Sequence, residues 1–192
     1  MQLRLSEEHQ LFRDTVREFA REVIAPRAAE MDRTAEFPFD LSDRMAEFDL
    51  MGVHIPEEYG GLGADTLSYA IAVEEVSYAS GSMGLMLSAH LSLGAYPIYL
   101  FGAEEQRRRY LPDLASGRML GAFGLTEAEA GSDAGATRTT AVRTGDEWVI
   151  NGSKLYCTSG AIAGVTTITA MTDRAAGKRG ITNFMVPKER RE

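Results

Sequence analysis

The chain has 192 residues, 44% of them hydrophobic and 25% charged, and this balance excludes collagen-like, coiled-coil and wholly disordered proteins. Its length allows one ordinary domain or two small ones, with a hydrophobic core. Twenty Lys and Arg residues against 28 Asp and Glu give a net charge of −8, which opposes nucleic-acid binding as the main activity. One cysteine permits no internal disulfide, and the three scattered histidines do not suggest a metal site.

No apolar run comes close to the length that crosses a bilayer. Residues 1–8 contain neither the apolar stretch of a secretory signal nor the Arg- and Ser-rich, acid-free composition of a transit peptide. We therefore expect a cytoplasmic protein that has neither a membrane nor a nucleic acid among its partners.

The first half of the chain predicts a bundle of about five helices. Ser6 is a typical N-cap for a helix with apolar residues three and four positions apart, and Pro26 is expected to end or kink this helix. Residues 41–51 repeat the amphipathic pattern, and Gly52 is a suitable residue to stop the helix.

Further along, residues 56–63 hold three glycines in their last four positions and cannot form a regular element. Asp65 caps the next helix, on which the adjacent carboxylates Glu74-Glu75 are interpreted as part of a solvated face. Residues 82–100 are apolar on nearly all sides, which is typical of a helix at the centre of a bundle. Residues 104–114 form the last predicted helix.

After residue 117 the pattern changes to short segments rich in Thr, Val and Ile, separated by turns that contain Gly or Asp. The predicted strands cover residues 120–125, 137–142, 147–150, 165–169 and 182–186, with a hairpin turn at residues 144–146. Helices followed by strands predict an α+β chain with two segregated parts. We expect a helical domain at residues 1–117 and a β domain at residues 118–192.

Most catalytic signatures are absent. Residues 60–63 are glycine-rich but lack the spacing and the preceding strand of a dinucleotide-binding loop. Ser132 does not lie on a nucleophile elbow. His90 is interpreted as a core histidine with satisfied hydrogen bonds, and Cys157 as a packing residue in a strand-like setting.

Two segments of the second half contain residues that could bind a ligand. Residues 123–133 run from a predicted strand into a turn with two hydroxyls and exposed backbone N–H groups, which could bind a flat heterocycle or a diphosphate. In residues 151–160, Tyr156 and Thr158 are two positions apart and would share one face of a strand, a ring for stacking beside a hydroxyl. On these residues alone, a plain strand–loop–strand of a β sandwich is the favoured interpretation.

Four segments read together change this interpretation. They are PEEYGGLG (residues 56–63), FGAEEQ (101–106), FGLTEAEAGSD (123–133) and NGSKLYCTSG (151–160). In this order, and over essentially the whole chain, they closely resemble the acyl-CoA dehydrogenase family. The resemblance implies an N-terminal helical domain, a middle β-barrel domain that is only partial here, and a C-terminal four-helix domain that is missing. FAD and the acyl-CoA thioester would lie between these domains.

The resemblance also implies a set of cofactor-binding residues, which are Phe123, Leu125, Thr126, Gly131, Ser132, Tyr156 and Thr158. Tyr156 would lie against the isoalloxazine, and Thr158 would lie near flavin N5. Ser132 would also contact the CoA arm of the substrate, and Leu91 is a second substrate candidate, although a core role for it is at least as favoured. Ala128-Glu129 stands where the family has Pro-Gly, and Tyr-Cys-Thr at 156–158 stands where it has Trp-Ile-Thr.

By this resemblance the parent protein is an oxidoreductase of fatty acid metabolism. It removes hydrogens from Cα and Cβ of an acyl-CoA thioester, with hydride transfer to flavin N5, and passes electrons to an electron-transferring flavoprotein; the parent is expected to be a homotetramer. The base glutamate belongs to the C-terminal helices, so no catalytic residue and no metal ligand is assigned within residues 1–192. We therefore expect the 192-residue chain alone to be inactive.

Two alternatives stay open. The chain could be a non-catalytic binding or assembly module derived from the same fold, or part of a flavin oxidase or monooxygenase that shares these motifs. The gene sequence downstream of codon 192 distinguishes a longer enzyme from a short module. The acyl chain that the parent accepts cannot be read from these residues.

Overall fold

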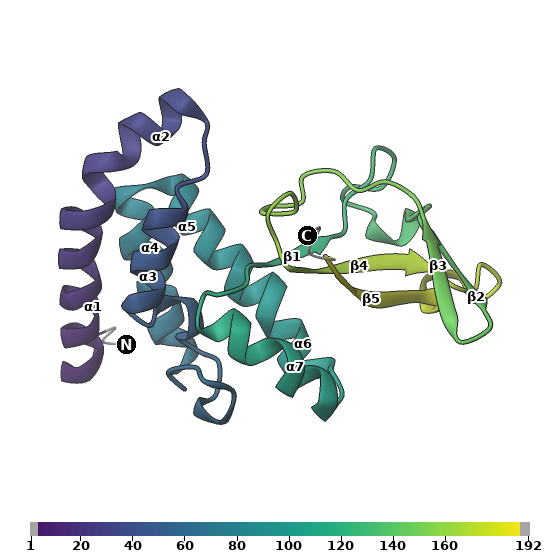
Figure 1. Cartoon of the computed structure of the whole chain (residues 1–192), viewed down its shortest axis with the longest axis horizontal. Coiled ribbons are helices and arrows are strands. Elements are labelled where there is room, and N and C mark those ends of the chain that lie inside the picture. The colour runs from purple at the N-terminus through teal and green to yellow at the C-terminus, as the bar shows by residue number, and fades with distance from the viewer. Residues whose placement is uncertain (1–3, 189–192) are drawn as a thin grey trace. The chain divides into compact units, whose positions relative to one another are not determined.

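The computed structural model describes residues 4–188, which divide after residue 119 into a helical unit and a sheet unit. Figure 1 shows helices throughout the first unit and strands in the second. The predicted α+β class, a helical bundle followed by a β unit, is therefore confirmed.

The α-helices described in the helical unit are α1 (Glu7–Phe19), α2 (Ala28–Thr34), α3 (Phe39–Glu47), α4 (Thr66–Ala79), α5 (Gly81–Ser88), α6 (Tyr96–Phe101) and α7 (Glu104–Ala115). Both predicted caps are present, because the Ser6 side chain accepts from the backbone N–H of His9 and the Asp65 side chain accepts from that of Ser68. Pro26 does not end the helical path, but the chain changes direction between α1 and α2 (Figure 1), in keeping with the predicted kink. This proline lies at the start of a 3₁₀ turn that leads directly into α2, a position where the missing N–H of proline is tolerated.

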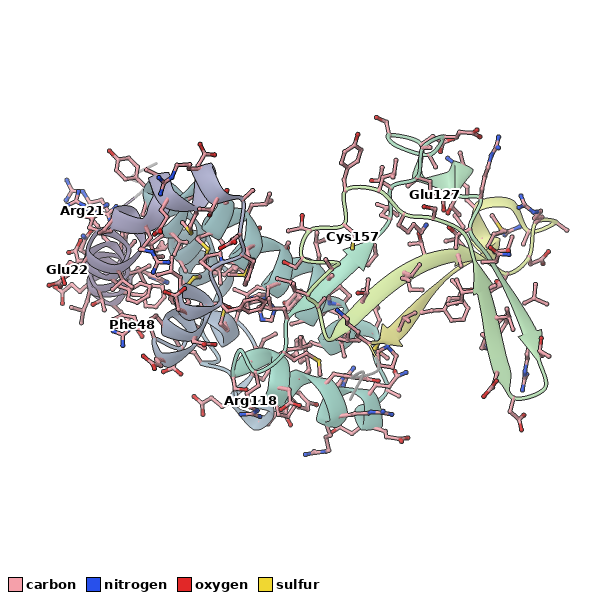
Figure 2. The ribbon with its side chains drawn as sticks, turned by 45° about the horizontal axis from the view of Figure 1, so that its top comes forward. Arg21, Glu22, Phe48, Arg118, Glu127 and Cys157 are labelled. Carbon is pink, nitrogen blue, oxygen red and sulfur yellow. The ribbon has the colours of Figure 1, made fainter. Side chains whose placement is uncertain are left out.

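Gly52 does not stop the third helix, which corrects the prediction. Helix α3 ends at Glu47, and Asp49 then takes the left-handed conformation with φ of 56°. Gly52 lies in a 3₁₀ turn where a Cβ atom would be 2.9 Å from the carbonyl oxygen of Ala115, so a side chain is excluded by close backbone approach. Phe48, labelled in Figure 2, stacks on Phe19 with ring centroids 4.5 Å apart.

Helices α5 and α6 are joined by a π-helical segment, Ala89–Ala95, into one continuous helix from Gly81 to Phe101. Leu87 and Leu91 on this helix have no exposed surface, whereas Leu85 is 59% exposed, so only one face is buried. Within residues 4–188, this 21-residue helix is the one that is long and apolar enough to cross a membrane by length and composition, and half of that stretch is buried inside the structure. The prediction that no apolar run reaches such a length was therefore wrong.

Glu75 is not part of a solvated face. Its carboxylate is 6% exposed and accepts two hydrogen bonds from Arg17 of α1, from Nε at 2.9 Å and from Nη2 at 2.7 Å. Adjacent residues of a helix point about 100° apart, so Glu75 turns toward α1 while Glu74 is exposed, as was predicted for both. The pair joins α1 to α4.

The sheet unit contains five described strands, β1 (Gly121–Gly124), β2 (Thr140–Thr144), β3 (Glu147–Asn151), β4 (Val165–Met171) and β5 (Ile181–Pro187). Strand β4 is central: it runs parallel to β1, with Gly121 opposite Val165, and antiparallel to β5. Strand β2 meets β4 in parallel at Met171 and forms a hairpin with β3, with Gly145 at φ of 64° in the turn. What was predicted as a partial barrel is, in the residues described, a five-stranded mixed sheet.

Candidate functional site

The two segments singled out from the sequence lie side by side in the sheet unit. The backbone N–H of Leu155 donates to the carbonyl oxygen of Thr126 at 2.8 Å, and Lys154 Nζ donates to that of Leu125 at 3.1 Å. At Gly124 a Cβ atom would lie 3.1 Å from Lys154 Cγ, tighter than side chains normally pack, so a glycine here suits the close approach. Residues 123–133 and 152–160 therefore form one surface, which we call the loop surface.

The turn after β1 presents free hydrogen-bond donors. Glu127 and Ala130 close it with reciprocal backbone hydrogen bonds of 3.0 and 3.2 Å. Gly131 and Ser132 follow, both exposed, and within the described residues their backbone amides and the Ser132 hydroxyl make no hydrogen bond. Consecutive free amides of this kind bind phosphate oxygens without requiring a positive side chain.

Asp133 fixes the end of this turn. Its carboxylate accepts from the backbone N–H of Gly135 at 3.2 Å and from Lys178 Nζ at 3.1 Å. The hydrogen bond from Lys178, with the attraction of its charge, lowers the pKa of Asp133 below its usual value. This carboxylate thus remains ionised and holds the turn in place.

Tyr156 does not lie on a strand, so the argument that it shares a strand face with Thr158 was wrong. Strand β3 ends at Asn151, and the chain then curls through two left-handed residues, Tyr156 at φ of 55° and Ser159 at φ of 61°. A left-handed conformation is unfavourable for a residue other than glycine and is concentrated at functional sites. It presents the Tyr156 ring to solvent with 90% of the residue exposed, free to stack on a flat ligand.

Two threonine hydroxyls complete the loop surface. Thr126 and Thr158 are both partly buried, yet in the part of the chain that is described neither side chain makes a hydrogen bond. A partly buried hydroxyl without a protein partner is available to the polar edge of a ligand. Phe123 is also partly buried, and Leu125 is 38% exposed.

Beneath the loop surface lies a buried ion pair that the sequence did not predict. Glu127, labelled in Figure 2, is 8% exposed and accepts from Lys154 Nζ at 2.7 Å and from the Thr137 hydroxyl at 2.5 Å. Two backbone N–H groups, those of Arg138 and Thr139, donate to the same carboxylate. Burial by itself would raise the pKa of Glu127, but these donors outweigh it and hold the pKa far below the usual range.

Glu129, which stands in place of the glycine of the family's Pro-Gly, is paired with a cation. Glu129 forms an ion pair with Arg138, and both side chains are exposed. The negative charge of Glu129 is thereby compensated by a neighbouring cation. It does not leave the turn with an unpaired acidic group.

Residues 6–118 match the N-terminal domain of acyl-CoA dehydrogenase, and residues 122–192 match its middle domain. The chain belongs to the acyl-CoA dehydrogenase family. It is 50% identical over 190 residues to a probable acyl-CoA dehydrogenase, YngJ, of Bacillus subtilis, covering 98% of this chain and 50% of that protein. The chain spans about half the length of the curated relatives it matches.

Solved structures agree with this assignment. A chain from a structure described as the electron transferring flavoprotein of Acidaminococcus fermentans is 46% identical, with a TM-score of 0.94 over 98% of this chain and 50% of that chain. A glutaryl-CoA dehydrogenase from Mycobacterium smegmatis, solved in complex with FADH2, is 34% identical, with a TM-score of 0.90 over 96% of this chain and 46% of that one. Structural relatives of this acyl-CoA dehydrogenase family member therefore bind FAD.

The residues on the loop surface fit such a cofactor. The exposed Tyr156 ring suits a tricyclic ring system, the hydroxyls of Thr126 and Thr158 have no other partner, and the amides of Gly131 and Ser132 suit phosphates. Each of these groups is a donor or an apolar face, which is what a flavin and a diphosphate require.

The positions of two further residues are explained by packing. Cys157 (Figure 2) is partly buried beside a cavity of about 600 Å³ on the sheet unit, and burial raises the pKa of its thiol, so it is not an activated nucleophile. Leu91 is fully buried in the helical unit, as a core residue would be, and its contact with substrate stays a prediction.

Proposed function

We propose that this chain is the N-terminal half of an FAD-dependent acyl-CoA dehydrogenase and that its loop surface holds the flavin. The observation that carries the proposal is the exposed, left-handed Tyr156 beside two partly buried hydroxyls without partners. A strained aromatic residue next to unpaired polar groups costs stability, and such arrangements persist where a ligand uses them. Membership of the family supports FAD and an acyl-CoA thioester as those ligands.

The residues of the loop surface bind and orient in this proposal. Tyr156 stacks against the ring system, Thr126 and Thr158 donate to its polar edge, and the amides around Ser132 bind phosphate oxygens. When bound, FAD supplies the electron-accepting chemistry for the hydrogen that leaves Cβ of the thioester.

The proton from Cα needs a base, and we assign none in this chain. Glu127 and Glu75 are the buried glutamates among residues 4–188, and each is held by a cation, Lys154 and Arg17 respectively. The lowered pKa of Glu127 makes it a poor proton acceptor. The base is proposed to come from the remainder of a longer protein, as are the contacts of a homotetramer.

Electron-transferring flavoprotein is the proposed electron acceptor. This proposal is supported by one relative, 46% identical to this chain, which comes from a structure described as the electron transferring flavoprotein of Acidaminococcus fermentans. The cytoplasm remains the proposed location.

The test uses the full-length protein, expressed from the gene including the sequence beyond codon 192. We expect a flavin absorbance band that is bleached anaerobically by a short, medium or branched acyl-CoA thioester. Thr158→Val should slow this reduction by about 10²–10³-fold, because it removes one hydrogen-bond donor from a preorganised site. Thr15→Val is the matched control, since Thr15 is exposed on α1 and its hydroxyl donates to the backbone carbonyl of Leu11 in the same helix.

A full-length protein that binds no flavin would overturn the proposal. Equal reduction rates in wild type and Thr158→Val would remove Thr158 from the site. A stop codon after residue 192 would instead favour a non-catalytic module.

A further inference from the structure

The buried ammonium group of Lys154 contacts several segments of the sheet unit at once. The side chain is 9% exposed, and Nζ lies within hydrogen-bond distance of four oxygens. These are the carbonyl of Leu125 (3.1 Å), Glu127 Oε1 (2.7 Å), Thr137 Oγ1 (3.2 Å) and Thr169 Oγ1 (2.9 Å). They belong to the end of β1, the turn after it, the approach to β2, and β4.

We infer that Lys154 is a positioning residue that locks residues 123–133 and 152–160 into one rigid surface for the flavin. The inference deepens the proposed function and rests on it for the identity of the ligand. The lock itself is a property of this chain alone and can be tested without any ligand.

The chain path explains why one ammonium group can do this. Lys154 immediately precedes Leu155, whose N–H donates to the carbonyl of Thr126 at 2.8 Å, while Nζ donates to the carbonyl of Leu125, one residue earlier. The loop is thus attached to the strand end at two successive carbonyls, by its backbone and by its side chain. Tyr156 follows directly, in the left-handed conformation with φ of 55°.

The carboxylate of Glu127 makes the lock strong. It sits 8% exposed among four donors, namely Lys154 Nζ, the Thr137 hydroxyl and the backbone N–H groups of Arg138 and Thr139. A buried carboxylate that loses its cation is strongly destabilised, so the pair can separate only if the turn rearranges. The ion pair therefore couples the turn that contains Glu127 to the loop that contains Lys154.

The lock predicts a specific loss in Lys154→Met, which keeps the length of the side chain and removes the charge. Amide hydrogen exchange at Leu155 is expected to rise at least about tenfold in the 192-residue chain, because its acceptor at Thr126 is no longer held. Amides of the β4–β5 ladder are expected to keep their wild-type rates. In a titration of the full-length apoprotein with FAD, the Lys154→Met variant should require about tenfold more ligand for half-saturation, as expected when a preorganised site becomes mobile.

Two further variants separate positioning from stability. Glu75→Gln breaks the ion pair with Arg17 in the helical unit, where the Glu75 side chain is 6% exposed and so about as buried as that of Glu127. It should therefore lower the melting temperature and leave both readouts unchanged. The double variant Lys154→Met/Glu127→Gln leaves no lone buried charge and should recover part of the melting temperature. It should still exchange fast at Leu155 and still bind FAD weakly, which a purely structural role of Lys154 does not predict.

Wild-type exchange at Leu155 in both Lys154 variants would overturn the inference. So would wild-type FAD titration curves in variants whose exchange is fast, because the lock would then have no bearing on the ligand. Absence of FAD binding by the wild-type full-length protein would contradict the proposed function instead, while the exchange comparison would still decide whether Lys154 holds the two segments together.

Discussion

Acidification is expected to destabilise the helical unit through His90, which has no exposed surface. Its Nε2 lies 3.1 Å from the carbonyl oxygen of Leu114 and 3.2 Å from that of Met51, so this nitrogen is the donor. A second proton would place a positive charge in the core. Burial accordingly lowers the pKa of His90 from 6.5 to about 4, although the two carbonyls favour the charged form.

The magnitude follows from the difference between the folded and unfolded chains. Between pH 6.5 and about 4 the unfolded chain binds a proton at this position and the folded chain does not, so stability falls as the pH falls through this window. Each pKa unit corresponds to about 1.4 kcal/mol. The loss between pH 7.5 and pH 4.5 should therefore be about 2–3 kcal/mol, a large fraction of the stability of a small domain.

Urea unfolding followed by far-UV circular dichroism at these two pH values measures the loss. His90→Gln is the comparison protein, since glutamine keeps an amide donor and does not titrate. Other titrating groups are common to both proteins and cancel when each is compared with itself at the two pH values. The wild type should lose about 2–3 kcal/mol more than His90→Gln; an equal loss in both would refute the assignment of a buried, neutral His90.

Three further predictions concern packing, backbone geometry and the activity of the 192-residue chain. Leu91→Ala should lower the free energy of unfolding by about 2–5 kcal/mol in urea titrations, because Leu91 is fully buried, and a change of less than about 1 kcal/mol would place it outside the core. Gly61→Ala should prevent normal folding, as judged by thermal melts, because the new Cβ would lie 2.1 Å from the carbonyl oxygen of Ile55; Gly131→Ala, with no atom within 4 Å, should melt like the wild type. The purified 192-residue chain should show no turnover with acyl-CoA thioesters in an anaerobic dye-reduction assay and should retain no stoichiometric FAD, whereas saturable turnover would show that the assigned lack of a base is wrong.

Local chemistry explains the sequence predictions that were confirmed. Ser6 and Asp65 cap helices because a short oxygen-bearing side chain satisfies a backbone N–H three residues away, an interaction contained in the sequence itself. The hairpin at Gly145 follows in the same way from a residue that tolerates positive φ between two β-forming segments. Four short motifs, read together, were sufficient to indicate the family, and two of them, residues 123–133 and 151–160, are in contact through Thr126 and Leu155.

Predictions failed where a neighbour distant in the sequence decides the conformation. Gly52 was expected to stop a helix, but its lack of a side chain serves a close approach to Ala115. Glu75 was expected in solvent, but Arg17, 58 residues away, draws it inward. Tyr156 was expected on a strand, and it adopts a left-handed turn instead. No periodicity within these segments carries that information.

The sequence by itself determined the class of fold, the order of the elements and the family, because these depend on local propensity and on short motifs. Only the tertiary structure decided what holds those residues in place. Glu127 and Lys154 are 27 residues apart, and the strand pairings that join β1 and β2 to β4 bring them together with Thr137 and Thr169. Once this group is excluded from water, each charge is stable only beside the other, so the pair depends on the whole sheet unit and on no segment of it alone.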